Sequence, residues 1–114
     1  MKVYISGKIT GLSPTLYLPL FEMAERQLKA AGFIDVVNPT KLGIDPEEEW
    51  SKAMAVCMAA LEKCEAIYML ENWPQSLGAR RELTRAMEKR MVTMFSPDDI
   101  EKEKYYLAHR ARTG

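Results

Sequence analysis

The segment Gln75–Glu82, with the sequence QSLGARRE, holds the residues whose types and spacing are best suited to chemistry. It follows the apolar run Ala66–Leu70 and opens a helical stretch, Leu77–Arg90. A strand that ends in a turn and continues as a helix leaves unpaired backbone N–H groups at that turn, and these groups can bind an anion. Ser76 suits the N-cap of this helix, because its hydroxyl can accept a hydrogen bond from the first turn.

Glu82 is the candidate for the chemistry itself. Gly78 and Ala79 precede it by four and three residues and share its helix face, and helical side chains lean towards the N-terminus. We therefore expect a carboxylate beside a small void, close to the anion site. The alternative is an ordinary solvated helix carboxylate that pairs with Arg85 at i+3.

A second candidate for anion binding is the loop after the first strand, where Lys8 and Thr10 lie between Gly7 and Gly11. Such a loop offers backbone N–H groups, an ammonium and a hydroxyl to a phosphate. The alternative is an ordinary turn with an exposed lysine, because neither the P-loop nor the dinucleotide-binding glycine pattern is present.

The composition indicates one globular domain over residues 1–114, with 47% hydrophobic residues. Lysine plus arginine and aspartate plus glutamate both number 16, so the charge does not indicate a nucleic-acid partner. No apolar run approaches the ~20 residues of a membrane span, and no signal peptide is evident, so we expect a soluble cytoplasmic protein. Two cysteines, Cys57 and Cys64, and one histidine, His109, make no metal set, and we expect no metal and no cofactor.

Strands and helices are expected to alternate along the chain. The expected strands are Lys2–Ser6, Asp35–Asn38, Ala66–Leu70 and Met91–Phe95. The expected helices run from near Leu18 to Ala31, from about Pro46 or Glu47 to Lys63, over Leu77–Arg90, and from a cap at Ser96–Asp99 into a basic tail, His109–Arg112. This alternation predicts an α/β fold, a small flavodoxin-like three-layer sandwich with a four-stranded parallel sheet of order 2-1-3-4.

Ligands of such sheets bind beyond the carboxyl ends of the strands, at the switch point between the first and third strands. The loop Gly7–Gly11, the turn Asn38–Pro39 and the turn Gln75–Ala79 should therefore surround one crevice. Tyr4 lies near the carboxyl end of the first strand, where its hydroxyl either reaches the crevice or belongs to the core. Trp73 either walls a base-sized pocket or covers the end of the sheet.

Four stretches in this order resemble the nucleoside 2-deoxyribosyltransferase superfamily, and within it the small DUF4406-type branch. They are YISGKITGL, F-x-x-A-E-x-x-L-x-x-x-G, VVNP and CEAIYMLENWPQSLGARRELTRA, and together they cover roughly residues 2–95. The segment S-L-G-x-x-x-E also resembles the 2-deoxynucleoside 5-monophosphate N-glycosidases.

The resemblance implies that Glu82 attacks the anomeric carbon of a nucleoside or nucleotide and passes the sugar to another base or to water. It implies that Tyr4 lies beside the sugar and the nucleophile, and that Ser76, Lys8 and Thr10 hold a 5-phosphate. The predicted catalytic residues are Glu82 and Tyr4. The predicted substrate-binding residues are Gly7, Lys8, Thr10, Gly11, Asn38, Trp73, Ser76 and Gly78.

Two positions depart from the superfamily pattern. Its characterised members carry an aspartate, which helps to protonate the leaving base, eight residues before the acidic residue that opens the third strand. Counting back eight from Glu65 gives Cys57, which cannot act as a carboxylic acid. The deoxyribosyltransferases also carry an aspartate six residues before the nucleophile, whereas this chain has Ser76, which favours a nucleotide over a nucleoside.

Three hypotheses about function follow from these residues. The first is an enzyme that cleaves or exchanges the N-glycosidic bond of a nucleoside or nucleotide. The second is a non-catalytic nucleotide-binding protein that has lost the general acid, and the third is an accessory protein that acts by protein contact alone. A domain this small makes a shallow crevice, so we expect a homo-oligomer in which Tyr105, Tyr106 or the methionine-rich helices of a neighbour cover the site.

Overall fold

The computed structural model describes residues 1–113, with the side chains of residues 1–106. The elements are β1 (Lys2–Ser6), α1 (Pro14–Ala30), β2 (Asp35–Val37), η1 (Pro39–Lys41), α2 (Trp50–Glu62), β3 (Ala66–Met69), η2 (Trp73–Gln75), α3 (Leu77–Glu88), β4 (Val92–Met94) and α4 (Pro97–Thr113). The expected basic tail His109–Arg112 belongs to the end of α4, and its side chains lie outside the described residues. Among the described helices, none has the length and apolar character needed to cross a bilayer.

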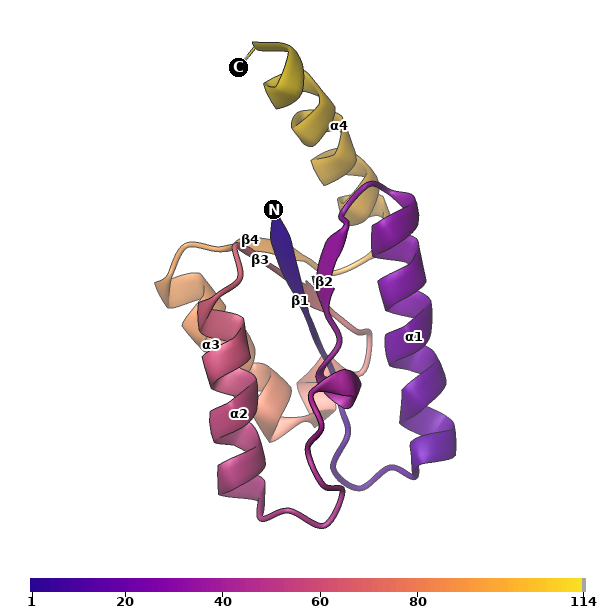
Figure 1. Ribbon diagram of the computed structural model, residues 1–114, viewed down its shortest axis with the longest axis vertical. Coiled ribbons are helices and arrows are strands. Elements are labelled where there is room, and N and C mark those ends of the chain that lie inside the picture. The colour runs from indigo at the N-terminus through magenta and orange to yellow at the C-terminus, as the bar shows by residue number, and fades with distance from the viewer. Residues whose placement is uncertain (114) are drawn as a thin grey trace.

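The four strands form one parallel sheet of order β2-β1-β3-β4, which confirms the predicted fold. The central strand β1 pairs with β2 on one side and with β3 on the other, so that Tyr4 lies opposite both Val37 and Ile67. Figure 1 shows α1 on one side of the sheet and α2 and α3 on the other, with α4 extending away beside the N-terminal end of β1. The sheet is thus the middle of three layers.

Alternation along the strands divides the core into two clusters. Val3 and Ile5 of β1 face α1 and the start of α4, where Phe21, Leu28 and Ile100 pack on them. Tyr4 of β1, with Ile67 and Met69 of β3, faces the other way and packs against α2 and α3. This second cluster also includes Leu61, Ala79 and Leu83. Side chains two residues apart on a strand point to the same face of the sheet, so Tyr4 and Ser6 both point towards α2 and α3.

Helix α1 begins at Pro14, four residues before the predicted start near Leu18. Pro14 occupies the first helical position, where a missing N–H costs nothing and the fixed φ suits a helix. Pro19 then lies inside the helix and removes one backbone hydrogen bond. Because Pro19 is exposed, water can satisfy the carbonyl left without its partner. The prediction was wrong because it treated Pro19 as the starting signal.

Helix α2 begins at Trp50 and not at the predicted Pro46 or Glu47. The Asp45 carboxylate accepts a hydrogen bond from the Glu47 N–H at 2.9 Å, and the Asp45 carbonyl accepts one from the Glu48 N–H at 2.9 Å. These two bonds close a turn that competes with the helix. The other predicted strand and helix bounds differ from the structure by two residues or fewer, as expected where ends fray.

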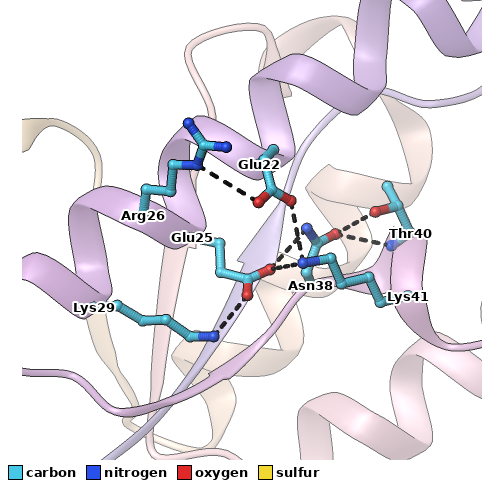
Figure 2. A network of polar contacts seen from close by, with 7 residues as sticks. All are labelled: Glu22, Glu25, Arg26, Lys29, Asn38, Thr40 and Lys41. Atoms are coloured by element: carbon cyan, nitrogen blue, oxygen red, sulfur yellow. Dashed lines mark hydrogen bonds and ion pairs between the residues drawn. The ribbon is translucent and has the colours of Figure 1, made fainter.

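A buried carboxylate, Glu25, ties α1 to the turn after β2 (Figure 2). It accepts hydrogen bonds from Lys29 Nζ at 2.8 Å and from Asn38 Nδ2 at 3.1 Å, and it forms an ion pair with Lys41 Nζ at 3.0 Å. Burial alone would raise the pKa of Glu25, but these three donors outweigh burial and lower the pKa to about 2. The ionised form of Glu25 is therefore part of the folded structure.

We expect Glu25→Gln to lower the free energy of unfolding at pH 7 by about 2 kcal/mol, because it removes the buried charge that the two lysines contact. The loss is not larger, because these lysines are about half exposed and solvent partly screens their charges. A depressed pKa stabilises the fold above the unfolded value near 4.5, and this contribution is lost as the pH falls through about 2. The difference between variant and wild type should thus shrink between pH 4.5 and pH 2 in urea denaturation. Glu22→Gln, at a side chain that is 42% exposed, is the control and should change stability by less than ~1 kcal/mol.

Candidate functional site

Two hydroxyls from β1 converge at the carboxyl end of the sheet. Tyr4 and Ser6 are two residues apart, so both side chains point to the face covered by α2 and α3. Both residues are fully buried. A buried hydroxyl requires a hydrogen-bond partner, and both find the same one.

That partner is Glu82 of α3, which is only 5% exposed. The Tyr4 hydroxyl donates to Glu82 Oε2 at 2.5 Å, and the Ser6 hydroxyl donates to Glu82 Oε1 at 2.7 Å. The alternative of a solvated carboxylate paired with Arg85 is wrong, since Arg85 pairs instead with Glu62 at 2.5 Å. The structure therefore brings together the two residues predicted to be catalytic, and it adds Ser6.

The environment shifts the proton equilibria of this cluster. Burial raises the pKa of Glu82, and the hydrogen bonds from Tyr4 and Ser6 lower it in part, which leaves the pKa at about 7. Burial, followed by the adjacent charge of Glu82, raises the pKa of Tyr4 well above its usual value. Near neutral pH the protonated and ionised forms of Glu82 thus have similar populations, while Tyr4 remains a neutral donor.

Cys57 of α2 is the third side chain beside Tyr4. It is half-buried and packs on the cluster that contains Tyr4, and its thiol lies close enough to Tyr4 and Glu82 for their polar groups to affect it. Burial, assisted by the charge of Glu82, raises the pKa of Cys57. At neutral pH it is therefore an uncharged thiol, which is a weak acid and a poor nucleophile.

The loop after β1 lies beside the loop after β3. Ser6 is in register with Met69, and the Lys8 backbone N–H donates to Asn72 Oδ1 at 3.0 Å. Thr10 and Gly11 are exposed, with Gly11 at a φ of 86°. No ion pair among the described side chains includes Lys8, so its ammonium is available to an anion.

Gly7, where this loop begins, is packed too closely for any side chain. A Cβ at this position would lie 2.5 Å from Leu70 Cδ1 and 2.9 Å from Leu70 Cβ. We therefore expect Gly7→Ala to lower the free energy of unfolding by about 2 kcal/mol through overpacking. Thermal denaturation checks this, with Thr10→Ala in the same loop as an exposed control. If the two variants are equally stable, the loop rearranges around the added methyl group without a loss of stability.

The N-terminus of α3 forms as predicted. The Ser76 hydroxyl accepts a hydrogen bond from the Ala79 N–H at 3.1 Å, which confirms Ser76 as the N-cap. The space over Gly78 is narrower than the expected void, because a Cβ there would lie 3.3 Å from Met54 Sδ and 4.0 Å from Trp50 Nε1. Side chains of α2 therefore cover Gly78, next to the helix turn that carries Glu82.

Two other predicted site residues, Asn38 and Trp73, are held by contacts of their own. Asn38 is buried in the Glu25 network, where its amide oxygen accepts from the Thr40 N–H at 3.0 Å and from the Thr40 hydroxyl at 2.6 Å. Trp73 packs against the α2 and α3 core cluster and against Phe95, with ring centroids 6.0 Å apart. In this structure Trp73 covers the end of the sheet, which was one of its two interpretations.

Two surface grooves, of about 370 and 340 Å³, lie away from the Glu82 cluster. The first follows the outer side of α3 beside α2, and the second lies between the end of α1 and the start of α4. Neither is lined by Tyr4, Ser6 or Glu82. Within the part of the chain that the structure describes, no three His, Cys, Asp or Glu side chains are grouped as metal ligands would be.

Comparison with known families accounts for most of the chain. The profile of DUF4406, a domain of unknown function, matches residues 1–95. The chain belongs to the DUF4406 family. The match spans this DUF4406 domain from β1 to the end of β4, which includes all of the Glu82 cluster, and it leaves α4 outside. No curated protein and no solved structure matches the chain.

Two polar residues of the DUF4406 site were missed by the sequence predictions. Ser6 could have been found from its spacing, because it follows Tyr4 by two residues on the same face of the strand. Asn72, which ties the two loops together, carries no local signal, because its partner is the Lys8 backbone N–H 64 residues away.

Proposed function

We propose that this protein cleaves or exchanges the N-glycosidic bond of a nucleoside or nucleoside 5-monophosphate, with Glu82 as the nucleophile. The observation that carries the proposal is the position of Glu82. It is a buried carboxylate, held by the Tyr4 and Ser6 hydroxyls, at the carboxyl end of a parallel sheet. Sheets of this kind bind their ligands at that edge, next to the switch point formed by β1 and β3.

The chemistry requires an anion close below the anomeric carbon. One Glu82 oxygen would bond to that carbon as the bond to the base nitrogen breaks, and the departing base would take a proton from solvent water. Water, or a second base, would then displace Glu82 from the sugar. The two O–H donors orient the carboxylate before the substrate arrives, so that less reorganisation is needed during reaction.

The loops around the carboxylate provide a seat for a phosphate. The N-terminus of α3 offers the backbone N–H groups of Leu77 and Gly78, which precede the capped N–H of Ala79, and Lys8 and Thr10 lie in the adjoining loop with an ammonium and a hydroxyl. Asn38 takes no part, because its amide belongs to the Glu25 network. We expect inorganic phosphate or a nucleotide to bind between residues 7–11 and 76–79.

The sequence resemblance to the nucleoside 2-deoxyribosyltransferases and to the 5-monophosphate N-glycosidases supports the same chemistry. Glu82, Tyr4, Ser76, Lys8 and Thr10 occupy the matching positions in this chain. Because Glu82 is only 5% exposed, the side chains that cover it must move aside for a sugar to reach it. We expect this opening to accompany substrate binding.

A second function is favoured by one observation. The thiol of Cys57 beside Tyr4 is a poor proton donor for a departing base, because burial raises its pKa. A protein with this site would then bind nucleotides without cleaving them. The two functions share the phosphate seat and differ in turnover.

The test is incubation with a panel of deoxynucleosides, ribonucleosides and their 5-monophosphates, followed by chromatography for free base. Calorimetric titration of the same compounds measures binding. Base release supports the enzyme, and binding without release supports the nucleotide-binding protein. If neither base release nor binding is found, both functions are contradicted, and action by protein contact alone remains.

The pH dependence of base release should follow the ionisation of Glu82. Only the carboxylate form is a nucleophile, and the pKa is about 7. The rate should therefore fall about tenfold per pH unit below pH 7 and level off above it. A single-turnover pH profile measures this. A rate that is already constant at pH 5 would contradict either the assignment of Glu82 or its raised pKa.

A further inference from the structure

Trp50, the first residue of α2, is a large aromatic side chain that the core does not enclose. It is 37% exposed and belongs to neither core cluster of the described residues, although tryptophan is highly buried on average. Figure 1 shows that α2 begins at the end of the sheet towards which β1 runs. Trp50 therefore lies at the edge where parallel sheets bind their ligands.

The N-terminus of α3 accommodates Trp50 at a residue that has no side chain. A Cβ at Gly78 would lie 4.0 Å from Trp50 Nε1, so the indole approaches the first turn of α3 at this glycine. Leu77 and Gly78 are also the residues whose backbone N–H groups belong to the proposed phosphate seat. The indole is thus beside the place where a 5-phosphate would bind.

Arg81 covers one face of this indole. Its Cζ lies 5.2 Å from the centroid of the Trp50 ring, and both side chains are exposed. A guanidinium is planar and stacks on aromatic rings, but at an exposed site this attraction is weak. Arg81 therefore occupies, and can leave, a position that a flat base could take.

Arg81 also lacks an acidic partner. No ion pair among the described side chains includes it, whereas Arg85, one turn further along α3, pairs with Glu62. Lys89 pairs with Glu62 as well, so the two helices are already joined beyond Arg81. Arg81 follows Gly78 by three residues on the same side of the helix. Its charge is therefore uncompensated about one turn from the phosphate seat.

We propose that Trp50 and Arg81 form the subsite that recognises a nucleoside 5-monophosphate: the base stacks on the Trp50 indole, and Arg81 moves from the indole to the phosphate. This inference rests on the proposed function, since it assigns two parts of the same ligand. Stacking on an aromatic side chain accepts every base, because every base has a π face. Arginine binds phosphate through two parallel N–H···O bonds. One movement of Arg81 thus uncovers the indole and brings a cation to the phosphate.

The test is calorimetric titration of the full chain with deoxyadenosine and with its 5-monophosphate. We expect Trp50→Ala to weaken the binding of both ligands at least about tenfold, because both lose the stacking surface. Arg81→Ala should weaken only the monophosphate, again about tenfold, and should leave the nucleoside bound as tightly as before or more tightly. Arg80→Ala is the matched control. It removes the same charge at the neighbouring position, on a different helix face, and should change either affinity less than about twofold.

Tryptophan fluorescence provides a readout that a purely structural role of Trp50 would not change. The chain contains two tryptophans, Trp50 and Trp73, and a base stacked on Trp50 should quench the emission. Trp50→Phe should abolish this quenching, yet bind the monophosphate within about fivefold of wild type, because phenylalanine also stacks on bases. Circular dichroism of each variant confirms that it is folded.

Three results would overturn this inference and leave the proposed function standing. They are monophosphate binding that Trp50→Ala does not change, quenching that persists in Trp50→Phe, and an equal loss of nucleoside and monophosphate affinity in Arg81→Ala. If the wild type binds neither ligand, the inference fails together with the nucleotide site of the proposed function.

Discussion

Glu82→Gln is expected to abolish base release, with a loss of roughly 10³-fold or more. An amide cannot form the bond to the anomeric carbon, so the covalent route is closed. Glutamine still offers one oxygen to the hydroxyls of Tyr4 and Ser6, which both donate to Glu82 in the wild type. It therefore imitates the protonated form of the acid, which has a substantial population at a pKa of about 7.

The structural cost of this change has to be measured together with the rate. Glu82→Gln leaves one of the two buried hydroxyls without an acceptor, at a cost of about 1–3 kcal/mol, and Glu82→Ala leaves both without one. The glutamine variant is thus the cleaner test. Ser6→Ala is the matched control, since it removes a donor but keeps the nucleophile and should reduce the rate far less. If Glu82→Gln releases base as fast as the wild type, the nucleophile is elsewhere.

Cys57→Asp is expected to raise base release by roughly 10²–10⁴-fold, because it supplies a general acid for the departing base. Cys57 is half-buried and adjoins Tyr4, so an aspartate there can remain hydrated while it reaches the cluster. The nearby carboxylate of Glu82 would disfavour a second negative charge and keep the new group protonated. That is the state in which an acid can donate.

Cys57→Asn is the matched control for this prediction. Asparagine has the shape and polarity of aspartic acid but lacks its acidic proton. A similar gain in both variants would therefore mean that the size or polarity of the side chain, and not its acidity, limits the rate. Circular dichroism and thermal denaturation of the two variants show whether the helix packing survives. No gain with Cys57→Asp in a folded protein would favour binding without cleavage.

The sheet was predictable from the sequence because its signals are local and repeat along the chain. Apolar runs separated by amphipathic helices define the strand order, and Ser76 has a side chain suited to its N-cap position. The start of α1 was wrong because two prolines, Pro14 and Pro19, give the same signal within one helix turn and a half. The predicted start of α2 was wrong because the residue type of Asp45 does not reveal the two hydrogen bonds that it accepts in the turn before the helix.

The candidate site was only half predictable, since its contacts join residues far apart in the chain. The 78-residue separation of Tyr4 and Glu82 hides their hydrogen bond from any local pattern, and the resemblance supplied their pairing. The same sequence reasoning assigned Asn38 to the crevice because it follows a strand. Its actual partner, Glu25, lies on a helix face that looks like any other charged surface until the turn after β2 folds against it.

The position of β1 at the centre of the sheet has a consequence for synthesis of the chain. Strand β1 leaves the ribosome before β2 and β3 and must pair with both, and its partners in β3 come more than 60 positions later. Until β3 is made, one edge of β1 has no neighbour, and such an open strand edge invites pairing with another chain. Contacts of this sequence separation form slowly. Release of the nascent chain before Met69 should therefore yield aggregation-prone fragments, whereas a stop after Phe95, beyond β4, should yield a chain with all four strands able to pair.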